Sequence, residues 1–260
     1  MTPFPVAMIF VLIFGLCVGS FLNVVVARQR RSARSIISPG STCPGCGSAI
    51  AWYDNLPVLS YAMLHASCRT CRTQISWRYP AVELTCGVLF AMAYLHFGPS
   101  LKLVGTLILL SGLIAITGID LDHQIIPDVL SIPGTVAGLL WSLTPYGIGW
   151  KDSVFGVLIG GGVFVVIILA SALVLGQPGM GVGDVKLGAM LGAFLGWQLA
   201  LLSILLSVLV GGLLAATLLA SGRKARKDPL PFGPFLALGG VVSLFWGDSL
   251  LGWYFAQFLN

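Results

Sequence analysis

A short glycine-rich stretch near residue 180 carries an acid in a setting suited to chemistry. It reads Gly179-Met180-Gly181-Val182-Gly183-Asp184-Val185-Lys186 and opens directly into apolar sequence. A charged group at membrane depth is energetically costly, so ionisable residues in such surroundings are candidates for function. The neighbouring glycines remove side-chain bulk and allow another backbone to approach the carboxylate of Asp184. An N-cap aspartate that starts a packed membrane helix is the alternative interpretation.

The glycines recur after this acid at a helical spacing. Gly188, Gly192 and Gly196 follow Asp184 at intervals of four residues. Residues four apart share one face of a helix, and small residues on such a face let neighbouring helices pack closely. The pattern predicts a helix whose packing face runs away from the acid.

Four of the nine acidic residues fall near the ends of apolar segments, namely Asp120, Asp122, Asp128 and Asp184. Two carboxylates in a pocket of low dielectric constant share a proton, so one can deprotonate water while the other donates a proton, as in aspartic proteases. We expect Asp120 to partner Asp184, because it directly follows an apolar run whereas Asp122 lies nearer the loop. Polar turn chemistry is the expected role of Asp122 and Asp128, and the latter suits the first turn of a helix after a proline.

Four of the six cysteines form two Cys-x-x-Cys pairs, Cys43/Cys46 and Cys68/Cys71. Four thiolates close a tetrahedral zinc site and leave no open coordination position, so the predicted zinc is structural. Two disulfides are the alternative, but they are disfavoured if this segment lies on the reducing side of the membrane.

The composition is that of a membrane protein. The chain has 260 residues, of which 57% are hydrophobic and only 9% are charged, whereas a soluble domain has about a quarter charged residues. Spans in lipid are helical, so we expect an all-α polytopic membrane protein. The net charge of +5 is not arranged as a basic stripe interleaved with aromatic residues, so no nucleic-acid partner is predicted.

About eight transmembrane helices are predicted. The apolar run 185–219 is 35 residues long, which as one helix would measure roughly 50 Å against a hydrocarbon core of roughly 30 Å. We therefore divide it at Gly196-Trp197-Gln198. The predicted spans are about 6–26, 80–97, 101–119, 126–145, 154–175, 232–258 and the two arms of 185–219.

Basic residues orient these spans. With the N-terminus outside, 12 of the 14 Lys and Arg residues lie on the cytoplasmic side, as the positive-inside rule requires. The predicted organisation is a first transmembrane helix (1–27), a cytoplasmic zinc-binding insert (28–79) and a seven-helix membrane domain (80–260). The cytoplasmic basic residues are Arg28, Arg30, Arg31, Arg34, Arg69, Arg72, Arg78, Lys186, Arg223, Lys224, Arg226 and Lys227, and those outside are Lys102 and Lys151.

Several motifs occur together in an order that resembles the bacterial type IV prepilin peptidases, in the long form with a cysteine-bearing insert. The Gly-x-Gly-Asp element alone is shared with presenilin-like intramembrane proteases. The motifs that carry the resemblance are Gly19-Ser20-Phe21-Leu22-Asn23, the two cysteine pairs, Tyr79-Pro80-Ala81-Val82-Glu83-Leu84, the run from Ile119-Asp120 to Ile126-Pro127-Asp128, and Gly181-Val182-Gly183-Asp184.

The resemblance implies a bifunctional enzyme of the bacterial inner membrane that serves type IV pili or type II secretion. Such an enzyme cleaves the basic leader of prepilins and pseudopilins on the cytoplasmic side, then methylates the new N-terminus with S-adenosylmethionine. It implies Asp120 and Asp184 as the catalytic aspartates, and Glu83 and Gly87 as candidates for methyl transfer. No Gly-x-Gly-x-x-Gly fingerprint marks a methyl-donor site.

Two other classes of protein are compatible with parts of the sequence. A transporter would use intramembrane acids as an ion relay, but it would place them near the midplane of the membrane. A zinc-bearing assembly factor without enzyme activity would have no aspartate that matters for turnover.

Overall fold

The computed structural model of the chain describes residues 4–29, 41–177, 179–222 and 230–258. All regular elements within these ranges are helices, apart from two isolated β-bridges. The predicted all-α class is therefore confirmed. Most basic residues of two clusters that the sequence predicts to be cytoplasmic lie outside the described residues, namely Arg30, Arg31, Arg34, Arg223, Lys224, Arg226 and Lys227.

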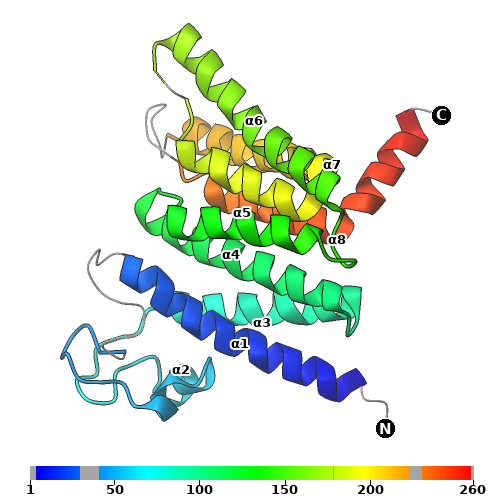
Figure 1. Cartoon of the computed structure of the whole chain (residues 1–260). Coiled ribbons are helices and arrows are strands. Elements are labelled where there is room, and N and C mark those ends of the chain that lie inside the picture. Colours follow the sequence, from blue (N-terminus) through cyan, green and yellow to red (C-terminus); the bar gives the residue numbers. More distant parts are fainter. Residues whose placement is uncertain (1–3, 30–40, 178, 223–229, 259–260) are drawn as a thin grey trace. The chain divides into compact units, whose positions relative to one another are not determined.

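The chain forms two compact units, Met1–Leu103 and Val104–Asn260. The first unit contains two long helices, α1 (Phe4–Gln29) and α3 (Arg78–Phe97). Between them lie the short helices η1 (Trp52–Asn55) and α2 (Leu59–Met63), which belong to the cysteine-bearing insert. Figure 1 shows α1 in blue and α3 in cyan.

Small residues join α1 to α3. A Cβ atom added to Gly15 would lie 2.8 Å from the Cα of Gly87, and one added to Gly19 would lie 2.7 Å from the Cα of Glu83. Gly15 and Gly19 are four residues apart on α1, and Glu83 and Gly87 are four residues apart on α3. The contact therefore follows one face of each helix. Lipid is as apolar as the side chains, so such close backbone packing is what holds membrane helices together.

The second unit holds most of α4 (Leu101–His123), followed by α5 (Asp128–Ser142), α6 (Trp150–Leu175), α7 (Val182–Ala220) and α8 (Gly233–Phe258). The helix α4 contains the predicted apolar span 101–119 and ends at His123, with a polar last turn that begins at Asp120. The helix α5 begins at Asp128 directly after Pro127, as the proline predicted.

A break at Gly196 divides α7 into two arms, at the predicted position. Gly196 has φ 80° and ψ 172°, a conformation that glycine adopts without strain. Added to Gly160 of α6, a Cβ would lie 2.3 Å from the carbonyl oxygen of Gly188 and 3.6 Å from the Cβ of Ala200. In a straight helix Gly188 and Ala200 would be about 18 Å apart, so the second arm folds back beside the first (Figure 1).

The first arm of α7 packs against α6 through backbone atoms. A Cβ on Gly156 would lie 2.1 Å from the carbonyl oxygen of Gly192, and one on Gly192 would lie 1.9 Å from that of Gly156. Gly160 and Gly188 repeat this relationship one turn away. The predicted small-residue face of α7 is thus confirmed at Gly188 and Gly192, while Gly196 forms the break.

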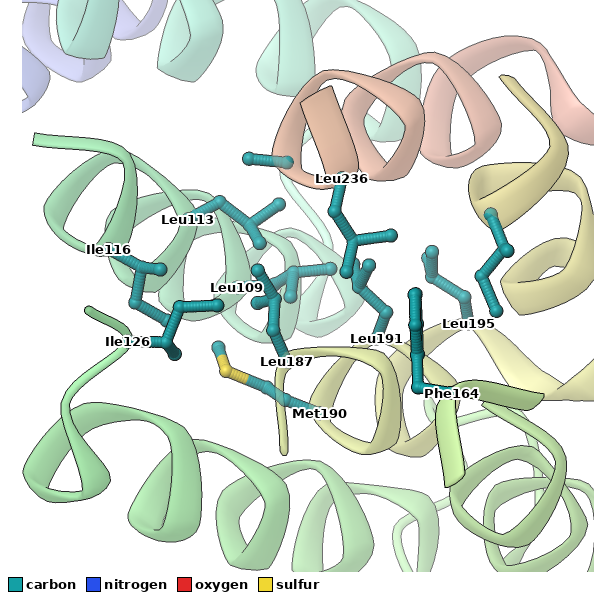
Figure 2. Packing of buried hydrophobic residues seen from close by; sticks show 12 residues of the cluster. Leu109, Leu113, Ile116, Ile126, Phe164, Leu187, Met190, Leu191, Leu195 and Leu236 are labelled. Atoms are coloured by element: carbon teal, nitrogen blue, oxygen red, sulfur yellow. The ribbon is translucent and has the colours of Figure 1, made fainter. Parts of the chain in front are cut away.

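Buried apolar side chains from α4, α6, both arms of α7 and α8 fill the centre of the second unit (Figure 2). Ile126, from the segment between α4 and α5, joins them. The cluster consists of Leu109, Leu113, Ile116, Ile126, Phe164, Leu187, Met190, Leu191, Leu195, Ile204, Leu236 and Ala237.

Six of the described helices are long and apolar enough to cross a membrane: α1, α3, α4, α6, α7 and α8. The chain is therefore a multi-pass membrane protein. The predicted number of eight spans is approximate, because α5 has 15 residues and would measure about 22 Å. The remaining predicted span corresponds to the second arm of α7, after the break at Gly196.

Candidate active site and metal centre

Asp184 lies in the first turn of α7 and is buried, with 8% of its surface exposed. The amide of Gly181, the N-cap residue, donates a 3.2 Å hydrogen bond to its Oδ2 atom. Asp184 therefore occupies the third position of the helix and contributes to a capping box, rather than being the N-cap itself. This contact holds one carboxylate oxygen in a fixed position.

Gly183 makes room for a neighbouring segment beside the acid. A Cβ atom there would lie 2.9 Å from the Cβ of Ile126. The side chain of Ile126 is buried in the apolar cluster of the second unit. The absence of a side chain at position 183 therefore lets the segment before α5 pack against the start of α7.

Asp120 lies in the last turn of α4 and is 4% exposed. Its Oδ2 atom accepts a 2.9 Å hydrogen bond from the amide of Gly233, the first residue of α8. No sequence pattern predicts a role for Gly233, since neither a charge nor a metal-ligand spacing marks it.

The carboxylates of Asp120 and Asp184 are close enough for their charges to interact. Each is held by a backbone amide at a helix start, Asp184 at α7 and Asp120 at α8. The positive end of a helix dipole favours negative charge at such positions. The second unit thus brings together two buried acids that the sequence predicted would meet.

The other two aspartates of this group lie in more solvated positions. Asp122 is exposed, whereas Asp120 on the same helix is buried. The carboxylate of Asp128 pairs with the ammonium of Lys186, and the Asp128 side chain is 57% exposed. This ion pair connects the first turn of α5 with the second turn of α7.

The four paired cysteines form a single cluster in the first unit. All their sulfur atoms lie within 4.8 Å of one another, and the sulfurs of Cys43 and Cys71 are 3.7 Å apart. Zinc–sulfur bonds of about 2.3 Å in a tetrahedron separate the sulfurs by about 3.8 Å. The cluster therefore fits a tetrahedral zinc site. The four cysteines are unbridged in the structure.

The two cysteine pairs sit in equivalent turns. In the first, the amide of Cys43 donates to the carbonyl of Ser48 at 2.9 Å, and in the second the amide of Cys68 donates to that of Thr73 at 2.9 Å. The hydroxyls of Ser48 and Thr73 contact the sulfurs of Cys46 and Cys71 at 2.8 Å and 3.1 Å. The insert thus contains a repeated turn that presents both halves of the metal site.

Hydrogen bonds make thiols of this cluster more acidic. Hydrogen bonds with Ser48 lower the pKa of the Cys46 thiol, and those with Thr73 lower the pKa of the Cys71 thiol. Backbone hydrogen bonds from Cys46 and Gly45 act to lower the pKa of Cys43, yet desolvation and the neighbouring thiols raise it to about 11. Four thiolates in one place need a compensating positive charge, which a bound metal supplies.

Glu83 is a buried acid in the first unit, 7% exposed. Its Oε2 atom accepts a 2.7 Å hydrogen bond from the amide of Val58, and the side chains of Ser20 and Asn23 also interact with it. Val58 has a positive φ of 62°. Gly87, one turn further along α3, packs against α1. Glu83 therefore connects α1, α3 and the insert.

Two family descriptions match the chain. "Bacterial Peptidase A24 N-terminal domain" matches residues 13–97, and "Type IV leader peptidase family" matches residues 107–216. A "Prepilin leader peptidase/N-methyltransferase" of Stutzerimonas stutzeri is 38% identical, over 94% of this chain and 92% of the relative. The chain belongs to the type IV leader peptidase family.

Other members of this family are similarly related. The proteins of the same name from Aeromonas hydrophila and Pseudomonas aeruginosa are each 37% identical, over 96% and 94% of this chain and 94% and 91% of the relatives. No solved structure gives a significant match. The N-terminal match contains the cysteine cluster and Glu83, whereas the leader peptidase match contains Asp120 and Asp184. Gly233 lies beyond both.

Proposed function

We propose that this chain cleaves the short basic leader of type IV prepilins and pseudopilins at the cytoplasmic face of the bacterial inner membrane, then methylates the new N-terminus. Membership of the leader peptidase family and the names of its relatives support both activities. The proposed cleavage activity is supported most directly by the pair of buried, interacting carboxylates of Asp120 and Asp184. Each carboxylate accepts a hydrogen bond from a backbone amide.

In the cleavage mechanism that we propose, Asp120 and Asp184 share one proton. The ionised carboxylate removes a proton from water, which attacks the scissile carbonyl carbon, while the protonated partner donates a hydrogen bond to the carbonyl oxygen. Breakdown of the tetrahedral intermediate then returns a proton to the leaving amide nitrogen. One oxygen of each carboxylate is held by an amide, so the other can face water or substrate.

For methyl transfer we propose that S-adenosylmethionine is the methyl donor and that Glu83 takes part. Its burial among α1, α3 and the insert supports a defined position for this carboxylate. We assign Gly87 an indirect role in the same site. Because it has no side chain, α1 can pack closely against α3, which brings Ser20 and Asn23 beside Glu83.

We propose a functional division into a first transmembrane helix (1–27), the zinc-binding insert (28–79) and the membrane peptidase domain (80–260). With the N-terminus outside, the insert and both aspartates face the cytoplasm, where a basic leader would also lie. This orientation rests on the distribution of basic residues. The zinc would be structural, since four cysteines leave no position for substrate.

The test is an assay of purified protein with a prepilin and labelled S-adenosylmethionine. Loss of the leader and label on the mature N-terminus are expected. The Asp184→Asn variant should not cleave the leader, but it should still methylate a pre-cleaved peptide. The reason is that the carboxylate pair takes no part in the proposed methyl transfer. Asp122→Asn, an exposed aspartate, is the matched control. Cleavage that persists in a folded Asp184→Asn variant would refute the mechanism.

A further inference from the structure

The segment between the two cysteine pairs is apolar and nearly uncharged. Residues 50–64 contain a single charged residue, Asp54. Arg69 neutralises it through two hydrogen bonds, 2.8 Å from Nε and 2.5 Å from an amino group of the guanidinium. This interaction holds the pKa of Asp54 below its ordinary value. The segment and its partner Arg69 therefore carry no net charge together.

Large apolar side chains of this segment lie on its surface. Trp52 is 80% exposed, Leu59 is 62% exposed and Met63 is 76% exposed. Leu59 and Met63 are four residues apart in α2, so they share one face of that helix. The helices η1 and α2 contact each other, and exposed apolar side chains on adjoining elements mark a site of interaction with a partner or a membrane.

A hydrogen bond fixes the depth of this surface. The amide of Val58, directly before α2, donates to the carboxylate of Glu83 at 2.7 Å. Glu83 follows Arg78, the first residue of α3, by five residues, which is about 7.5 Å along the helix. Interfacial helices place their apolar face about 5–10 Å into the boundary between headgroups and acyl chains. With Arg78 taken as the level of the headgroups, the start of α2 lies at this depth beside α3.

We propose that residues 50–64 lie in the membrane interface and that Leu59 and Met63 insert among phospholipid acyl chains. The segment is joined to α3 by the Val58–Glu83 hydrogen bond, and exposed apolar side chains continue along that helix, namely Trp77, which precedes it and is 71% exposed, Leu84 and Val88. Tryptophan is enriched where spans meet the headgroups. The position of the segment beside α3, its lack of net charge and the exposed apolar side chains along α3 favour lipid over a protein as the partner of this surface. The proposal does not depend on the peptidase or methyltransferase activity.

The test uses the full chain in nanodiscs of phosphatidylethanolamine and phosphatidylglycerol. The photoreactive residue p-benzoylphenylalanine replaces Leu59 or Met63, and Thr70 or Gln74 as controls, since both are exposed on the second cysteine turn. After irradiation, mass spectrometry should find about tenfold more lipid adduct at positions 59 and 63 than at the controls. Equal yields, or adducts with another part of the chain or with a second protein, would overturn the proposal.

A second measurement does not depend on the photoreactive variants. Trp52→Phe is compared with the unchanged protein in bilayers whose lipids carry bromine on the upper acyl chain. The emission lost on substitution, which belongs to Trp52, should be quenched by these lipids. An unquenched Trp52 component would contradict the proposed position. Zinc content and prepilin cleavage, measured on the same samples, separate this outcome from misfolding.

Discussion

The amide of Gly233 donates a 2.9 Å hydrogen bond to the Oδ2 atom of Asp120, across 113 residues of sequence. A Cβ atom added to Gly233 would lie 2.7 Å from that oxygen. The first residue of α8 therefore both supports the carboxylate and leaves space for it. The position of α8 is thereby coupled to the proposed catalytic pair.

Gly233→Ala should lower prepilin cleavage by tenfold or more, because the new methyl group displaces the Asp120 carboxylate. A tenfold loss corresponds to about 1.4 kcal/mol of transition-state stabilisation. Gly252→Ala on the same helix is the control, since a Cβ there meets no atom within 4 Å. Cleavage rates of the purified variants measure the effect. Equal activity of the two variants would show that α8 does not position Asp120.

Asp120→Asn should abolish cleavage, whereas Asp122→Asn should retain it, because only Asp120 is buried beside Asp184. Asp128→Asn removes the ion pair with Lys186, which is partly exposed. Such pairs contribute about 0–1 kcal/mol, so the expected loss is less than about fivefold. The three variants are compared for folding and for leader cleavage. An active Asp120→Asn variant with an inactive Asp122→Asn variant would overturn the assignment.

Gly192→Ala should destabilise the protein by about 3 kcal/mol, because its methyl group would overlap backbone atoms of α6 that cannot rotate away. Gly162→Ala, on α6, meets no atom within 4 Å. It should stabilise the helix by about 0.5–1 kcal/mol. Thermal unfolding in detergent compares the two. A Gly192→Ala variant as stable as the unchanged protein would mean that α6 and α7 separate more easily than their contact indicates.

The cysteine cluster should bind one zinc ion per chain. Changing Cys43 and Cys68 to serine removes a ligand from each turn and should abolish zinc binding. Cys17→Ser is the control, because this thiol lies on α1, outside the cluster. Metal analysis of the purified proteins gives the stoichiometry. Undiminished zinc in the double variant would place the metal elsewhere.

Glu83→Ala should loosen the insert around Val58, which has a positive φ and donates its amide hydrogen to the Glu83 carboxylate. Amide exchange at residues 56–60 should accelerate by about tenfold, as expected for loss of one hydrogen bond to a charged group. Glu83→Gln keeps an acceptor oxygen and should restore part of the protection. Thr85→Ala, exposed on the same helix, is the control. Unchanged exchange in Glu83→Ala would show that other contacts hold this segment.

Local patterns predicted the features that depend on neighbouring residues. Hydropathy located the long helices, cysteine spacing predicted the cluster, and the length of the apolar run located the break at Gly196. Hydropathy marked the apolar part of α4 up to Ile119, and the polar last turn, which contains Asp120, lies directly beyond it. The sequence carried no signal for the contact of Gly233 with Asp120, since a backbone donor has no characteristic side chain.

The same limit applies to contacts between distant polar groups. Arg69 and Asp54, and likewise Lys186 and Asp128, are ordinary charged residues whose pairing depends on how the chain folds. Glu83 was singled out only through family resemblance, and its contact with the amide of Val58 could not be inferred from spacing. These long-range contacts hold the two candidate sites in place.

The glycine contact between α6 and the first arm of α7 has a mechanical consequence. Two helices that touch through carbonyl oxygens and α-carbons have no rotamers to exchange, so they resist sliding past each other. A shift of one residue would bring a Cβ atom where Gly156 or Gly192 now admits the opposing backbone. Asp184, at the head of this rigid pair, has a fixed axial height. We therefore expect a substrate helix to enter between other helices, while α6 and the first arm of α7 keep their positions relative to each other.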